Sequence, residues 1–96
     1  MKLLEVVRAR REEILRLAAR HGARNVRVFG SAARGDADER SDIDLLVEME
    51  PDRSLLDHAA LWIDLQKLLN RRVDVVSERG IKPRIRNRVL REAIPL

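Results

Sequence analysis

The sequence predicts an α/β fold in which helices pack on a small β-sheet. Two observations support this fold class. Short segments are rich in β-branched residues, which favours strands, and longer segments carry apolar residues at helical spacing. The two kinds of segment alternate along the chain. The length, 96 residues, suits a single domain spanning residues 1–96. The predicted element order is α-β-(short α)-β-α-β-α, which is typical of helices covering a sheet.

The first third of the chain reads as helix, strand and turn. Residues 3–20 carry leucine, valine and isoleucine at helical spacing, with arginine and glutamate between them, which predicts one amphipathic helix. Gly22 follows as a helix stop. Residues 25–29, NVRVF, alternate and favour a strand. After Gly30, Ser31 is the predicted N-cap of a short helical turn.

The middle of the chain predicts a strand followed by a long helix. The strand covers residues 42–49, DIDLLVEM, and Pro51 closes it. The helix covers residues 54–69, with Ser54 as N-cap and Asp57 as the capping-box acid. The apolar residues expected to face the core on this helix are Leu55, Ala59, Trp62, Leu65 and Leu69.

The last part predicts one more strand and one more helix. Residues 72–76, RVDVV, form the strand, and Pro83 suits the first turn of a helix over residues 83–93. This helix carries several arginines, most simply a solvated face, with docking of an acidic partner or of a nucleotide as the alternative. They are Arg84, Arg86, Arg88 and Arg91.

Composition narrows the chemistry. Without cysteine, the chain can form neither disulfides nor thiolate metal sites, and thiol catalysis is excluded. The remaining candidate metal ligands are carboxylates and two isolated histidines, and carboxylates favour magnesium over zinc. The N-terminal segment is too charged for a signal sequence or a membrane span, so we expect a cytoplasmic protein without a membrane partner. The net charge of +4 suits an anionic ligand.

Three aspartates on two predicted strands form the candidate metal site. Asp42 and Asp44 point to the same face of their strand, about 7 Å apart along the chain. Such a pair raises the pKa of both carboxyl groups unless a cation lies between them. Asp74 lies between two valines that should face the core, so it projects to the opposite face. If the strands are neighbours, the three carboxylates converge and can hold two magnesium ions.

A candidate phosphate site lies close by in the sequence. Gly30 allows the backbone to approach an anion, and the N–H groups at the start of the following turn can bind phosphate oxygens. The Ser31 hydroxyl adds a donor, and Arg34 adds positive charge. Each residue also has a simpler interpretation, since Ser31 could be only an N-cap and Arg34 only solvated. The aspartate pair could likewise be ordinary strand-end residues.

The combination resembles the DNA polymerase β-like nucleotidyltransferase superfamily. Its signature is Gly-Ser, ten residues, then Asp-x-Asp, with a third acid on a later strand. Here Gly30-Ser31 is followed by ten residues and then by Asp42-x-Asp44. The Arg34-Gly35 pair and the S-D-x-D-L-x-V pattern of residues 41–47 are similar to the family's minimal branch.

The resemblance implies a mixed sheet and assigns roles to the site residues. Gly30 and Ser31 would contact the β- and γ-phosphates of a nucleoside triphosphate. Asp42 and Asp44 would bind two magnesium ions, and Asp74 would complete one site and help to deprotonate the acceptor. Larger relatives carry an additional domain for the base or the acceptor, so specificity here would come from a partner protein or from a dimer.

Minimal members of the family are commonly encoded beside a small helical HEPN-type toxin. The resemblance therefore implies an antitoxin that transfers AMP from ATP, or another nucleotide from an NTP, to a tyrosine of that toxin. The alternative is a non-catalytic binding module that neutralises the toxin by direct contact. Nucleic-acid recognition through the arginines ranks last, because Phe29 and Trp62 are the only aromatic residues and offer few stacking platforms.

Overall fold

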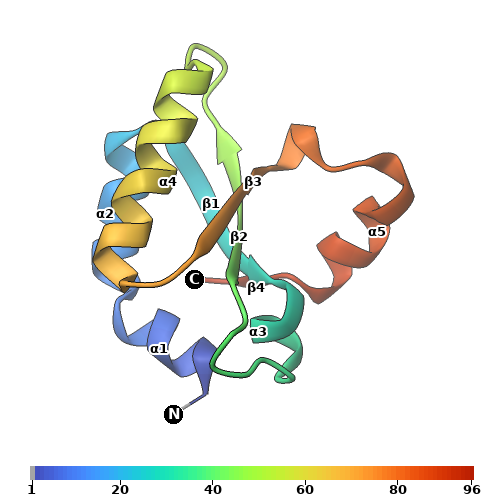
Figure 1. Cartoon of the computed structure of the whole chain (residues 1–96). Coiled ribbons are helices and arrows are strands. Elements are labelled where there is room, and N and C mark those ends of the chain that lie inside the picture. The colour runs from blue at the N-terminus through green and yellow to red at the C-terminus, as the bar shows by residue number, and fades with distance from the viewer. Residues whose placement is uncertain (1) are drawn as a thin grey trace.

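The computed structural model describes residues 2–96 and contains one four-stranded sheet with helices on both faces (Figure 1). The predicted α/β fold with a small mixed sheet is confirmed. The elements in chain order are α1 Leu3–Ala9, α2 Arg11–Arg20, β1 Ala23–Phe29, α3 Gly30–Arg34, β2 Ile43–Met49, α4 Leu55–Leu69, β3 Val73–Ser77, the 3₁₀ turn η1 Glu78–Gly80, α5 Pro83–Glu92 and β4 Ile94–Pro95.

The strand order is β3-β2-β1-β4, so β3 is an edge strand and β2 is central. β1 pairs antiparallel with both β2 and β4, whereas β2 and β3 run parallel. In the parallel pair, Asp44 lies directly opposite Asp74. The two strands that carry the predicted metal ligands are therefore neighbours, as the metal-site prediction required.

The two faces of the sheet have separate cores. On the face covered by α2 and α4, Ile43, Leu45 and Val47 are completely buried. On the other face, α5 packs a smaller core that includes Leu46 and Val89 (Figure 1). Because side chains alternate along a strand, Asp44 shares the α5 face with Leu46.

The N-terminal region differs from the prediction in two places. The single helix expected over residues 3–20 is divided into α1 and α2 at Arg10, whose backbone leaves the helical region at φ −109° and ψ 21°. The N-cap prediction for Ser31 is wrong, because α3 already begins at Gly30 and follows Phe29 directly. Ser31 lies inside the turn, and its carbonyl accepts a hydrogen bond from the Gly35 N–H at 3.0 Å.

The strand boundaries shift slightly. β1 begins at Ala23, ahead of the predicted start, and its pairing with β2 is irregular between Arg24 and Arg27, where Asn25 has a φ of 51°. The strands expected over residues 42–49 and 72–76 begin one residue later, at Ile43 and Val73. The turn η1 and the short strand β4 were not predicted.

Helix α4 has the predicted capping box at its N-terminus but a different core face. Ser54 and Asp57 form the capping box, and Asn70 ends the helix in the left-handed conformation. Leu65 and Leu69 are buried as predicted, together with Leu61. The core prediction is wrong for three other residues, which lie on the solvent side of the helix. They are Leu55, Ala59 and Trp62.

Helix α5 begins at Pro83 as predicted, and most of its arginines are exposed. Arg86 differs, because it is half-buried and donates to the Glu78 backbone carbonyl at 2.9 Å and to the Glu78 carboxylate at 3.4 Å. None of the helices within residues 2–96 is long and apolar enough to cross a membrane.

Candidate active site

The three predicted metal ligands lie at the same end of the sheet, where β2 and β3 begin. Asp44 and Asp74 are direct partners on neighbouring parallel strands, where adjacent backbones are about 4.8 Å apart, so their side chains project from the same face. Asp42 comes just before β2. Its carboxylate is half-exposed and lies 3.7 Å from the Arg72 guanidinium, an exposed pair that holds it only weakly.

The negative charge at this site is only partly compensated. Partial burial, together with the neighbouring charges of Asp74 and Asp42, raises the pKa of Asp44 to about 6. Arg34 opposes this shift but does not cancel it. A carboxylate whose ionised form is disfavoured by two neighbouring acids is an arrangement that a divalent cation would stabilise.

The donor set fits magnesium in its chemistry. It consists of carboxylate oxygens on one face of the sheet, which is what this hard cation prefers. Within residues 2–96, no group of three or more histidine, cysteine, aspartate or glutamate side chains is gathered closely enough to hold a metal ion as it stands. Asp74 is exposed and Asp42 half-exposed, so both side chains have room to turn toward an ion.

The turn from β1 into α3 packs directly against Asp44. Gly30 has a φ of +71°, which side chains with a Cβ rarely adopt. A Cβ at this position would lie 2.2 Å from Oδ2 of Asp44. Glycine is therefore required both by the backbone conformation and by the close approach of the turn to the predicted metal ligand.

The structure adds Glu92, which sequence reasoning missed, to the site. The Gly30 N–H donates a hydrogen bond to Oε2 of Glu92 at 2.6 Å, and Arg34 contacts the same carboxylate at 3.2 Å. The Glu92 side chain is only 15% exposed. A carboxylate thus binds the N–H and the arginine that the sequence assigned to phosphate. No local signal could reveal this contact, because 62 residues separate Glu92 from Gly30.

Arg34 is shared between two acids at this edge of the site. It lies 3.2 Å from Asp36 and 3.2 Å from Glu92. The hydrogen bond to Asp36, followed by that to Glu92, raises the pKa of the Arg34 guanidinium. Arg34 therefore stays charged next to Gly30. A bound phosphate would take the place of the Asp36 and Glu92 carboxylates that contact it.

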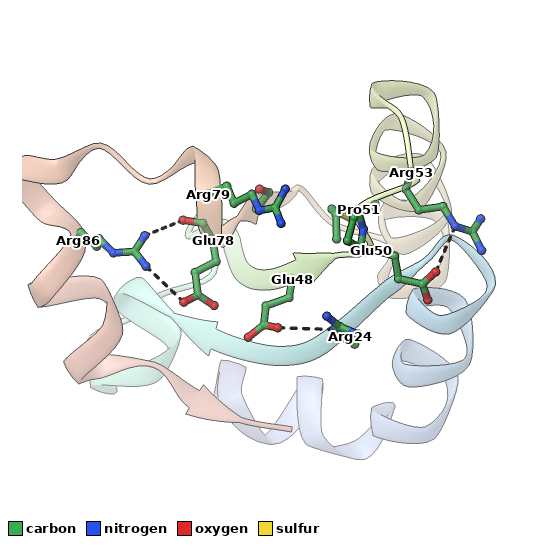
Figure 2. A pocket seen from close by; sticks show the side chains of 10 residues that line it. Arg24, Glu48, Glu50, Pro51, Arg53, Glu78, Arg79 and Arg86 are labelled. Atoms are coloured by element: carbon green, nitrogen blue, oxygen red, sulfur yellow. Dashed lines mark hydrogen bonds and ion pairs between the residues drawn. The ribbon is translucent and has the colours of Figure 1, made fainter.

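A charged hollow of about 320 Å³ lies elsewhere, where β2 and β3 end (Figure 2). Its acids are paired with arginines. Glu48 lies 3.6 Å from Arg24, and Arg86 contacts Glu78. Because these charges already neutralise one another, this hollow lacks the excess of negative charge that distinguishes the aspartate site.

Comparison with known proteins agrees with this fold. Residues 10–96 match the family described as Nucleotidyltransferase domain. The protein adenylyltransferase MntA of Thermococcus cleftensis is 45% identical over 78 residues, which cover 81% of this chain and 79% of that protein. A solved structure described as a candidate minimal nucleotidyltransferase has a TM-score of 0.87 at 66% identity, covering 97% of this chain and 95% of the other.

A more distant match shows the fold alone. One chain of a crystal structure of a toxin–antitoxin with AMP-PNP has a TM-score of 0.74 at 22% identity, covering 88% of this chain and 69% of that chain. The fold and the matches together define the class of enzyme. The chain belongs to the nucleotidyltransferase family, and within it to the minimal nucleotidyltransferases.

Proposed function

We propose that this chain is a magnesium-dependent protein adenylyltransferase, which transfers AMP from ATP to a hydroxyl group of a partner protein. The observation that carries the proposal is the pairing of Asp44 with Asp74 beside the Gly30 turn. The relative from Thermococcus cleftensis, named a protein adenylyltransferase, supports adenylyl transfer as the reaction.

Each residue has a proposed role. Asp42, Asp44 and Asp74 would hold two magnesium ions, which when bound supply charge neutralisation for the phosphates and an acidified acceptor hydroxyl. The Gly30 and Ser31 N–H groups and the Ser31 hydroxyl bind the β- and γ-phosphates, and Arg34 adds positive charge. Asp74, on the exposed edge strand, accepts the proton of the attacking hydroxyl.

The acceptor is proposed to be a tyrosine of a HEPN-type toxin, which makes this chain an antitoxin. The site lies on the only sheet within residues 2–96, and in this proposal another molecule presents the acceptor to it. The structural match described as a toxin–antitoxin shares this fold and supports a toxin as the partner.

Incubation with ATP labelled on the α-phosphate, magnesium and the neighbouring gene product tests the proposal. We expect label on the partner protein with the native chain and at least a hundredfold less with Asp42→Asn, because removing a group that stabilises the transition state costs about that much. Asp52→Asn is the matched control, since Asp52 is exposed on the turn before α4 and should leave the labelling unchanged.

Two results would contradict the proposal. Equal labelling by native protein and the Asp42→Asn variant would exclude the aspartates from the chemistry. If the variant still neutralised the partner without labelling it, the binding module would be the correct interpretation.

A further inference from the structure

The strand order gives the reaction a direction across the sheet. The Gly30 turn follows β1, Asp44 lies on β2, and Asp74 lies on the edge strand β3. In an in-line transfer, the attacking oxygen and the leaving pyrophosphate lie on opposite sides of the α-phosphorus. With the β- and γ-phosphates on the β1 side, the acceptor has to approach from beyond β3.

A depression of about 300 Å³ lies at that edge, at the lower end of the range for small-ligand pockets, roughly 300–1,000 Å³. Its wall is mostly apolar, and Asp74 supplies its one carboxylate. It is lined by Leu55, His58, Ala59, Trp62, Asp74 and Val75. The pocket therefore joins a hydrophobic surface to the residue proposed to take the proton of the acceptor.

The two rings in the wall are fixed by the edge strand. The Trp62 indole N–H donates to the Val73 carbonyl at 2.6 Å, and Nε2 of His58 donates to the Val75 carbonyl at 2.7 Å. These carbonyls face away from β2, where an edge strand has no partner strand. The pocket is thus formed before any ligand binds, which lowers the cost of binding.

The remaining wall is apolar surface left open to solvent. Leu55 is 85% exposed and Trp62 43% exposed, although both are large hydrophobic residues. A contiguous exposed apolar surface of this kind commonly marks a binding site. Its position against Asp74 favours an occupant that carries a hydrogen-bond donor, such as a hydroxyl.

We propose that this pocket binds the phenol side chain of the acceptor tyrosine, with the ring against Leu55 and Trp62 and the hydroxyl directed at Asp74. The inference rests on the proposed function. In the step it serves, the phenol oxygen forms a bond to the α-phosphorus of ATP. The bond from that phosphorus to the bridging oxygen breaks, pyrophosphate leaves with the electron pair, and the phenol proton passes to Asp74.

Trp62 itself reports on the pocket. It is the only tryptophan of the chain, and the chain has no tyrosine, so the intrinsic fluorescence excited at long wavelength comes from Trp62 alone. The probe is N-acetyl-L-tyrosinamide, titrated into the native protein without nucleotide. We expect a saturable change in emission in the millimolar range, and none with N-acetyl-L-serinamide, which lacks the ring.

Leu55→Glu and Leu56→Glu form a matched pair. Both residues lie in the first turn of α4, both are more than 80% exposed, and both substitutions add the same charge where an acid suits the helix dipole. Only Leu55 lines the pocket. We expect Leu55→Glu to weaken probe binding at least tenfold, while Leu56→Glu changes it less than threefold.

The outcomes separate this inference from the proposed function. No saturable change with the tyrosine probe, or equal losses in the two variants, would overturn the pocket assignment. A change caused by ATP but not by the probe would make the pocket a nucleobase site instead. Because the fluorescence titration requires no turnover, failure of AMP transfer in the labelling experiment would leave its result intact.

Discussion

Asp44 lies where its own charge is unfavourable. Its carboxyl is partly buried, faces Asp74 across the strand pair and has Asp42 two residues before it. These contacts raise its pKa to about 6, against 3.8 for an unperturbed aspartate. The ionised form of Asp44 therefore lowers the stability of the fold when no cation is bound. This is expected of a carboxylate whose stabilising partner is a bound cation.

This cost predicts an unusual dependence of stability on pH. The folded protein binds the Asp44 proton more tightly than the unfolded chain, so the free energy of unfolding falls as the pH rises from about 4 to about 6. The Asp44→Asn substitution removes the ionisable group and therefore this loss of unfolding free energy. We expect the variant, in EDTA, to be more stable than the native protein at pH 7 by on the order of 1 kcal/mol after solvent screening, with no difference at pH 3.5.

Urea denaturation at the two pH values measures the effect, with Asp52→Asn as the control for losing one exposed charge. If the native protein were as stable as Asp44→Asn at pH 7, the ionised Asp44 carboxyl would not be destabilised by its neighbours.

The aspartates could be found from the sequence because their geometry is local. Alternation along a strand places Asp42 and Asp44 on one face, and the flanking valines orient Asp74. Glu92 could not be found, since its contact with Gly30 depends on how α5 returns across the sheet. Local patterns thus located the acids that face the sheet surface but not the residue brought to them by tertiary packing.

At the scale of elements, α5 connects the site to the end of the described chain. The last residue of α5, Glu92, contacts the Gly30 turn, and β4, which follows the helix in the chain, pairs with β1. The Leu96 N–H then donates to the Val26 carbonyl at 2.9 Å. The position of the Glu92 carboxylate is therefore fixed on both sides, by the helix and by the strand.

This arrangement predicts that Glu92 competes with the triphosphate. Glu92→Gln removes a negative charge from the N–H and the arginine proposed to bind phosphate. We expect ATP with magnesium to bind the variant roughly tenfold or more tightly, because a hydrogen bond to a charged group contributes about 1.5 kcal/mol or more. Isothermal titration with a non-hydrolysable ATP analogue measures the affinity.

Asp36→Asn is the control for this prediction, since Asp36 also pairs with Arg34 but makes no hydrogen bond to Gly30. It should have the smaller effect. Weaker nucleotide binding by Glu92→Gln than by the native protein would mean that Glu92 supports the phosphate turn and does not compete for it.

Element boundaries were predictable where the sequence carries a specific signal. Ser54 with Asp57, and Pro83, marked the starts of α4 and α5 correctly. No glycine or proline marks the break between α1 and α2 at Arg10, and β4 is too short to show an alternation of apolar and polar residues. On α4, apolar residues occupy both the core side and the pocket side, so helical spacing alone could not separate the two.

At the scale of the whole molecule, the proposed functions follow the strand order. The Gly30 turn follows β1, and Asp44 lies on β2. The exposed Asp74 and the pocket that contains Trp62 lie at the β3 edge. In the proposed mechanism, one sheet would thus arrange the leaving group, the metals and the acceptor in that order. The exposed apolar surface beside Asp74 is consistent with an acceptor supplied by a second protein.

The central claim is that Asp42, Asp44 and Asp74 hold two divalent ions beside the Gly30 turn. The most direct measurement is anomalous diffraction from crystals grown with manganese and a non-hydrolysable ATP analogue. We expect two peaks roughly 3.5–4 Å apart, coordinated by the three carboxylates, with the triphosphate at the Gly30 N–H in place of Glu92. Manganese bound elsewhere, or an Asp74 carboxylate outside coordination distance of both ions, would contradict the account.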